Sequence, residues 1–124
     1  MWLFLPGGFL SVVAHRDHPD VLICWGRVKG DVERLLPARA VFETPDADYR
    51  FRGYLDRDTV ASVIAGHVAR IDYPKFKPAV TDKRRMPAYF AVWDQLWQLQ
   101  SELADKKPVQ GSFRRTRSGK LVMA

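Results

Sequence analysis

Two arginines and a tyrosine occupy alternate positions of one predicted strand: Arg50, Arg52 and Tyr54. Alternate side chains of a strand share a face, so two guanidinium groups and a phenol are expected side by side there. The opposite, apolar face of that strand is expected to hold Tyr49, Phe51 and Leu55. Guanidinium groups match phosphate geometry and a phenol ring stacks on a base, a combination that sheet-surface readers of single-stranded RNA use. The alternative is an ordinary solvated face on which each arginine pairs with an acidic side chain.

A second set of basic residues follows in a predicted connector. Lys75 and Lys77 flank Phe76, and Arg84 and Arg85 come shortly after. Point charges of this kind are sufficient for contacts with a nucleic-acid backbone, and such contacts weaken as the salt concentration rises. The alternative is a plain basic connector whose phenylalanine anchors it in the core.

A third basic stretch lies near the C-terminus, where Arg114 and Arg115 stand among further basic residues without a compensating carboxylate. Such a segment is typical of a basic arm that becomes ordered when it binds a polyanion. The alternative is an unstructured end with no binding role.

Catalytic chemistry finds little support in the residue pattern. Imidazole and carboxylate groups crowd one predicted turn, but with no recognised metal-ligand spacing: His15, Asp17, His18 and Asp20. Three carboxylates that would suit Mg²⁺ in a nuclease are Glu43, Asp46 and Asp48, although an Asp-Pro loop is explained equally by turn chemistry. Neither a phosphate-cradling glycine loop nor a nucleophile elbow is found. We therefore predict no catalytic residue, no metal site and no cofactor, and keep a metal-dependent nuclease as the least favoured hypothesis.

The composition indicates one basic globular domain. The 124 residues carry a formal net charge of +6. They are 47% hydrophobic, which is enough apolar side chain to form a core without a bound metal or a disulfide. The basic balance favours nucleic acid or an acidic protein as partner, and the alternative is a charge that serves solubility alone. The single cysteine, Cys24, lies in an apolar run and is expected to be a buried thiol.

The elements that must position these residues alternate in type along the chain. Predicted strands cover Trp2–Leu5, Phe9–His15, Val21–Val28 and Tyr49–Leu55. Predicted helices begin at Asp31 as N-cap, at Asp56 or Asp58, and around Pro87. This order indicates an α+β domain with an antiparallel or mixed sheet and two to three helices on one face. Among such folds, a ferredoxin-like arrangement is our first hypothesis. We place the domain at residues 1–104 and a basic flexible tail at 105–124.

Two further features bear on the core and on the location. The last helix carries an aromatic stripe of Tyr89, Trp93 and Trp97, which we interpret as core, with an interface as the alternative. The apolar start of the chain has no basic residue before it and is interrupted by Pro6, Gly7 and Gly8. It is therefore unlike a secretory signal and too short to span a bilayer, and we expect a cytoplasmic protein without membrane contact.

The chain also resembles a family of small bacterial and phage-type proteins over roughly its first hundred residues. The residues that carry the resemblance are Trp2–Phe4, Gly8–Val13, Arg27–Leu35, Thr44–Arg50, Ile71–Lys77 and Tyr89–Trp93. The family has no established activity, so the resemblance implies no catalytic role. It implies that the loop Thr44–Tyr49 and the connector Ile71–Lys77 are shared features, and exposed loops of that kind are better functional candidates than core positions.

Our first hypothesis is therefore a noncatalytic binding protein that contacts nucleic acid or another polyanionic partner through its basic surfaces. The alternative is a protein–protein effector, such as a small phage-type inhibitor of a host defence complex. The sequence leaves the oligomeric state open.

Overall fold

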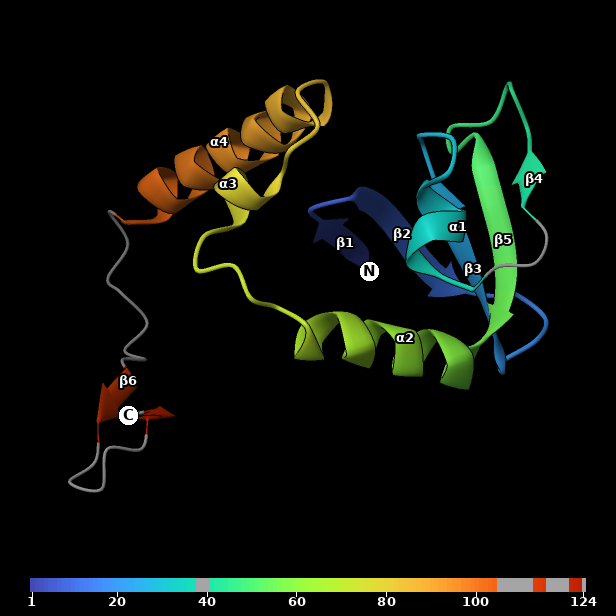
Figure 1. The fold of residues 1–124 in the computed structure, drawn as a ribbon, viewed down its shortest axis with the longest axis horizontal. Helices are drawn as coiled ribbons and strands as arrows, with labels where there is room; N and C mark the ends of the chain where they lie inside the picture. The colour runs from blue at the N-terminus through green and yellow to red at the C-terminus, as the bar shows by residue number, and fades with distance from the viewer. Residues whose placement is uncertain (38–40, 105–112, 116–120, 124) are drawn as a thin grey trace. The chain divides into compact units, whose positions relative to one another are not determined.

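The computed structural model describes residues 1–37, 41–104, 113–115 and 121–123, and side chains in all but the last two ranges (Figure 1). These residues form two compact units, Met1–Tyr89 and Phe90–Ala124, here called unit 1 and unit 2. Unit 1 holds the main sheet. The predicted domain boundary at residue 104 stays a prediction.

Unit 1 is built on a five-stranded antiparallel sheet. Its strands are β1 (Trp2–Leu5), β2 (Gly8–Ala14), β3 (Val21–Gly26), β4 (Phe42–Glu43) and β5 (Phe51–Asp56). Their order across the sheet is β1-β2-β3-β5-β4. The sheet confirms the predicted α+β fold, but the ferredoxin-like guess is wrong. That fold places a helix between its first two strands, whereas β1, β2 and β3 follow one another directly as a meander.

The described residues form four helices: α1 (Asp31–Leu35), α2 (Arg57–Ala69), α3 (Phe76–Ala79) and α4 (Arg85–Ala104). Helix α1 contacts β2, β3 and β5, and α2 contacts β3 and β5 (Figure 1). The predicted N-cap at Asp31 is wrong, because Gly30 takes that position with a φ of 91°. Left-handed backbone of this kind favours glycine, and it makes Asp31 the first helical residue.

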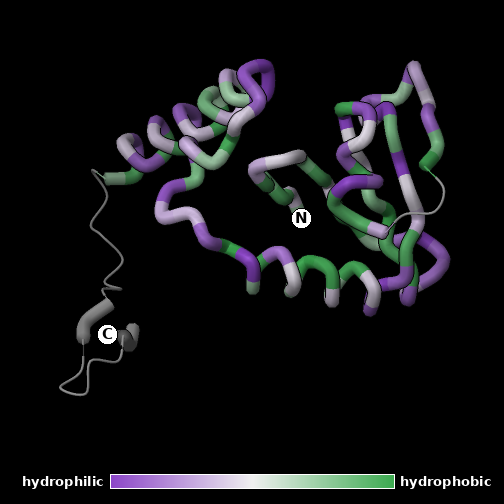
Figure 2. Tube along the Cα trace, viewed as in Figure 1, coloured by the Kyte–Doolittle hydropathy of each residue, from purple (hydrophilic) through white to green (hydrophobic). Residues whose placement is uncertain are grey.

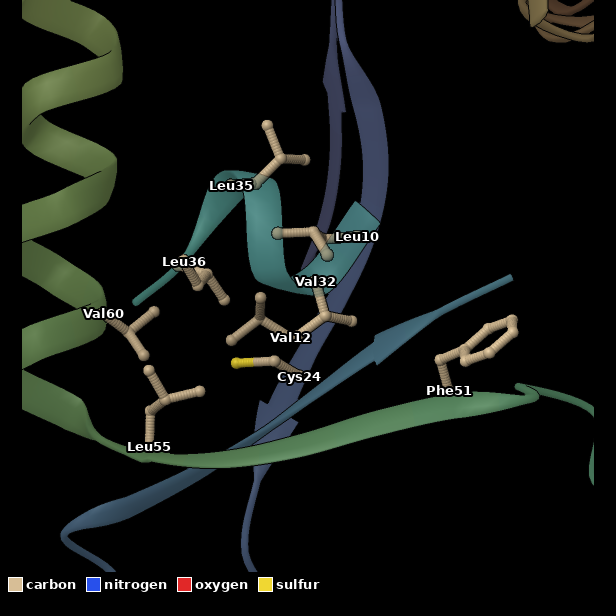
Figure 3. Packing of buried hydrophobic residues seen from close by; sticks show 9 residues of the cluster. All are labelled: Leu10, Val12, Cys24, Val32, Leu35, Leu36, Phe51, Leu55 and Val60. Atoms are coloured by element: carbon tan, nitrogen blue, oxygen red, sulfur yellow. The ribbon is translucent and has the colours of Figure 1, made fainter. Parts of the chain in front are cut away.

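The core lies between one face of the sheet and these two helices. Figure 3 shows the side chains that fill it: Leu10, Val12, Cys24, Val32, Leu35, Leu36, Phe51, Leu55 and Val60. The strand residues among them are spaced two apart within β2 and four apart within β5, as expected for a sheet with one buried face. His67 of α2 binds the carbonyl oxygen of Leu35 through Nε2 at 2.8 Å, which ties α2 to the end of α1.

A buried carboxylate, Asp31, joins three parts of unit 1. The two guanidinium NH groups of Arg85 donate to its two oxygens at 2.8 and 2.9 Å, and Arg34 pairs with it as well. The backbone N–H of Phe9 donates to Oδ2 at 3.1 Å. Asp31 has no exposed surface, and a Cβ added at Gly8 would lie 3.1 Å from its Cγ. The carboxylate therefore fastens the start of α4 and the β1–β2 hairpin to α1.

The thiol of Cys24 lies inside the core, as expected. Burial raises its pKa to about 11, because the thiolate would lose its hydration there. We expect no reaction between the native protein and a thiol reagent at pH 8, and labelling of one thiol per chain after unfolding in guanidinium chloride. Absorbance with an aromatic disulfide reagent checks this, and rapid labelling of the native chain would show that the core around β3 opens.

Unit 2 contains α4 from Phe90 onward and a hairpin of β6 (Phe113–Arg115) and β7 (Leu121–Met123). Trp93 and Trp97 are about half exposed, so the expectation that they form core is wrong for these two residues. Figure 2 shows polar and apolar residues mixed along α4. Within the described ranges, none of the helices combines the length and hydropathy that a membrane span requires.

Candidate nucleic-acid interface

The face of the sheet opposite the core, called the open face below, carries an aromatic ring on every strand. Paired residues of an antiparallel ladder point to the same side. The register pairs Trp2 with Ser11, Ser11 with Trp25, Trp25 with Arg52 and Arg52 with Phe42, which makes one row across the five strands. The rings of this face come from Trp2 and Phe4 in β1, Phe9 in β2, Trp25 in β3, Phe42 in β4 and Tyr54 in β5.

Three of these rings keep a large accessible surface. Trp2 is 66% exposed, Phe42 55% and Tyr54 45%. Phe42 meets Tyr54 nearly edge to face, with ring centroids 6.3 Å apart and an interplanar angle of 62°. Trp2 meets Phe9 in the same way at 6.0 Å and 76°. Because these rings touch through their edges, each retains surface on which a planar group can stack.

The ring of Trp25 is covered by a loop residue. Tyr49 stacks on it with centroids 5.2 Å apart and an interplanar angle of 19°. The guanidinium carbon of Arg27 lies 4.2 Å from the centroid of Tyr49, and Arg27 binds Asp48 at 3.0 Å, a hydrogen bond that raises the pKa of Arg27. The prediction that Tyr49 shares the apolar face of Phe51 is wrong, because β5 begins only at Phe51 and the alternation does not extend into the loop.

The two arginines beside Tyr54 have different surroundings. Arg50 directly precedes β5, and its Nε donates to Glu43 at 3.0 Å. Arg50 is therefore an ion-paired surface residue, which was the alternative considered from the sequence. Arg52 lies on the open face between Trp25 and Phe42. Its side chain forms no hydrogen bond or ion pair with the residues that the structure describes, and its Nε is buried without a partner, like Nε1 of Trp25. Among the described residues of this face, Arg52 is thus an arginine whose charge no carboxylate neutralises.

The other predicted basic residues lie on different elements. Lys75 and Lys77 are exposed at the start of α3. The side chain of Arg84 is 95% exposed and lies 3.8 Å from Asp82, whose pKa is lowered chiefly by the hydrogen bond from the backbone N–H of Arg84.

Arg85 is bound by Asp31, which raises its pKa, and its side chain is 9% exposed. We therefore leave it out of the interface. Arg114 and Arg115 belong to β6 in unit 2, and residues 105–112 and 116–120 of the predicted tail lie outside the described residues.

The turn histidines and loop carboxylates have local structural partners. Nδ1 of His15 accepts the backbone N–H groups of Asp17 at 3.1 Å and His18 at 3.2 Å. The candidate nuclease residues Glu43 and Asp48 are paired with arginines. In the part of the chain that is described, no three His, Cys, Asp or Glu side chains gather as a metal site.

Comparison with known proteins assigns no family to the chain. No protein-family model, no curated protein and no solved structure matches the chain. The geometry of the open face therefore carries the functional inference.

Proposed function

We propose that this chain is a noncatalytic binding protein that takes single-stranded nucleic acid on the open face of its sheet. One observation carries the proposal: each of the five strands presents an aromatic ring on that face, and three rings are 45–66% exposed. Aromatic platforms on a sheet are a recurrent means of binding unpaired bases. A cytoplasmic location is part of the proposal.

The arrangement of rings favours single strands over duplex. Every base offers a flat face, but in a duplex that face is already stacked on its neighbours. The open face belongs to a broad five-stranded sheet, whereas the major groove admits an α-helix or a two-stranded ribbon. Trp2 lies on the edge strand β1 and Phe42 on the opposite edge strand β4, so the exposed rings span the width of the sheet and suit several successive bases.

The charge on this face is modest, and this shapes the expected salt dependence. Arg27 and Arg50 are paired with carboxylates, which leaves Arg52 as the main phosphate contact. Each phosphate contact with a single strand contributes a slope of about −0.7 to the dependence of log affinity on log salt. We therefore expect a shallow slope, with stacking as the larger source of affinity.

Replacement of Arg52 by methionine tests the role of this arginine in the salt dependence. Methionine keeps an unbranched apolar side chain in the row but removes the charge, so the salt slope should become less negative by about 0.7. Fluorescence anisotropy over a salt series measures this slope. The labelled strand has about 12 nucleotides, within the range of site sizes of OB-fold proteins that bind single strands. Arg70→Met at the C-cap of α2, a helix that packs on the other face of the sheet, is the control and should leave the slope unchanged. An equal change in both variants would contradict a role for Arg52.

The basic experiment compares single-stranded DNA, single-stranded RNA and a hairpin duplex at constant salt. We expect either single strand to bind more tightly than the duplex, and the comparison of DNA with RNA identifies the natural class. No binding of any strand at low salt would refute the proposal.

A protein partner is the second candidate, because exposed Trp and Tyr together with Arg are also enriched at protein interfaces. It corresponds to the protein–protein effector considered from the sequence. A stoichiometric complex that survives nuclease treatment, and that is lost in ring variants of the open face, would favour it over the first.

A further inference from the structure

The middle of the open face is covered by a side chain of the protein itself. The exposed rings of Trp2 and Phe42 lie in one row on the two edge strands, four strand spacings apart, which is about 19 Å along the sheet. Trp25 lies midway in this row, on β3, but Tyr49 is stacked on its ring. A single strand that crosses the sheet from one edge ring to the other therefore meets a position that Tyr49 already occupies.

The stack of Tyr49 on Trp25 resembles that of a base on an aromatic platform. The two ring planes are inclined by 19° and their centroids lie 5.2 Å apart. The guanidinium carbon of Arg27 lies 4.2 Å from the centroid of the Tyr49 ring. Unpaired bases stack on aromatic rings and on arginine guanidinium planes alike. A base in the place of Tyr49 would therefore find both contacts already in position.

Two N–H donors at this position have no acceptor among the described residues. Nε1 of Trp25 and Nε of Arg52 are both buried and unpaired. The two residues are direct partners in the ladder between β3 and β5, so their side chains are neighbours on the open face. Buried donors without an acceptor are costly and rare in folded proteins. Phosphates and bases carry acceptor atoms, so a bound nucleotide can supply what Tyr49 does not.

The loop that carries Tyr49 is held to the sheet by exposed contacts. It joins β4 to β5 (Figure 1), and most of its residues, Thr44–Tyr49, are exposed. An ion pair ties it to the residue after β3, and the side chains of the two partners, Arg27 and Asp48, are 49% and 79% exposed. Exposed ion pairs contribute little to stability. The loop can therefore move off Trp25 while the core, on the opposite face of the sheet, stays intact.

We propose that Trp25 is the central base-binding position of the open face, and that Tyr49 occupies it until an unpaired base takes its place. The inference rests on the proposed function and adds a specific site and its ligand to it. The base stacks on Trp25, and an acceptor atom of the bound nucleotide receives the free N–H groups of Trp25 and Arg52. Because the stack with Tyr49 must first open, the apparent affinity is lower than that of an open site.

Proton cross-peaks between the rings of Tyr49 and Trp25 test the displacement directly in NMR spectra of the full chain. The probe is the tighter-binding of single-stranded DNA and RNA, at about 12 nucleotides. We expect these cross-peaks to disappear at saturation, and the Nε1 proton of Trp25 to move downfield as it gains an acceptor. Cross-peaks that persist while the resonances of Trp2 and Phe42 shift would overturn this inference and leave the proposed function standing. Absence of binding would overturn both.

Variants of the two stacked residues give a second test. Tyr49→Ala removes the competing ring and should tighten binding by about 2- to 12-fold, the equivalent of one aromatic pair. Tyr49→Phe keeps the ring and is the matched control, which should bind like the wild type. In the Tyr49→Ala chain, Trp25→Leu should weaken binding by about 5- to 150-fold, the effect of one lost stacking ring.

Two results would contradict the proposal. One is a Tyr49→Ala chain that binds no more tightly than Tyr49→Phe, and the other is a double variant that binds as tightly as Tyr49→Ala alone. Circular dichroism shows whether each variant is folded. The cross-peak measurement uses the wild-type chain, so it decides the question even where Trp25→Leu does not fold.

Discussion

Replacement of Asp31 by asparagine is expected to lower the free energy of unfolding by about 3–5 kcal/mol, the usual effect of removing one partner from a buried ion pair. The carboxylate has no exposed surface and accepts from Arg85, Arg34 and the backbone of Phe9. Asparagine has the same shape but only one acceptor oxygen. Its amide group would point a donor at another donor, and the guanidinium of Arg85 would stay buried without a counterion.

Urea denaturation followed by circular dichroism measures this loss. Glu33→Gln is the matched control, because it removes an exposed carboxylate from the same turn of α1 and should change stability by no more than about 0.5 kcal/mol. Domains of this size are stable by only about 5–15 kcal/mol, so the Asp31 variant should unfold at a clearly lower denaturant concentration. Equal midpoints for the two variants would show that the Asp31 contacts contribute little.

Removal of the exposed rings of the open face should weaken binding of single-stranded nucleic acid in steps. Stacking contributes about 1–3 kcal/mol per base when tested by alanine substitution, which is roughly a 5- to 150-fold loss of affinity for each ring. Trp2→Ala, Phe42→Ala and Tyr54→Ala are the informative variants, because their rings are the most exposed of the set. Anisotropy titration at fixed salt gives the dissociation constants.

The control for these variants is Val68→Ala on α2. Val68 is also exposed and apolar, but its helix packs on the opposite face of the sheet, so binding should not change. Thermal unfolding of each variant separates lost contacts from lost structure, since an exposed ring contributes little to stability. Ring variants that bind as tightly as wild type would remove the basis of the proposed function.

The sequence was sufficient to predict most of the local structure. Runs of apolar and β-branched residues correctly indicate β1, β2, β3 and β5, since each strand has enough residues to show its own pattern. Strand β4 is missed because its two residues, Phe42 and Glu43, are extended only through pairing with β5. The ferredoxin-like guess failed for a related reason, since strand order depends on contacts between distant segments.

The candidate site was only partly predictable. Alternation within β5 correctly places Arg52 and Tyr54 on one face, opposite Phe51. Trp2 joins the same row only through successive strand pairings, so no local pattern in the sequence reveals it. The pairing of Arg85 with Asp31, 54 positions away, is equally invisible to local patterns, and it turns a predicted phosphate contact into a structural residue.

The most direct test of the proposed function is an NMR titration of the isotope-labelled full chain with an unlabelled single strand of about 12 nucleotides. We predict that the side-chain resonances of Trp2, Phe42 and Tyr54 shift progressively to saturation, while those of the core residues Leu10 and Val60 stay in place. Unchanged resonances of the three rings at saturating nucleic acid, with shifts confined to α4 or to residues 113–123, would contradict the assignment of the open face as the binding site.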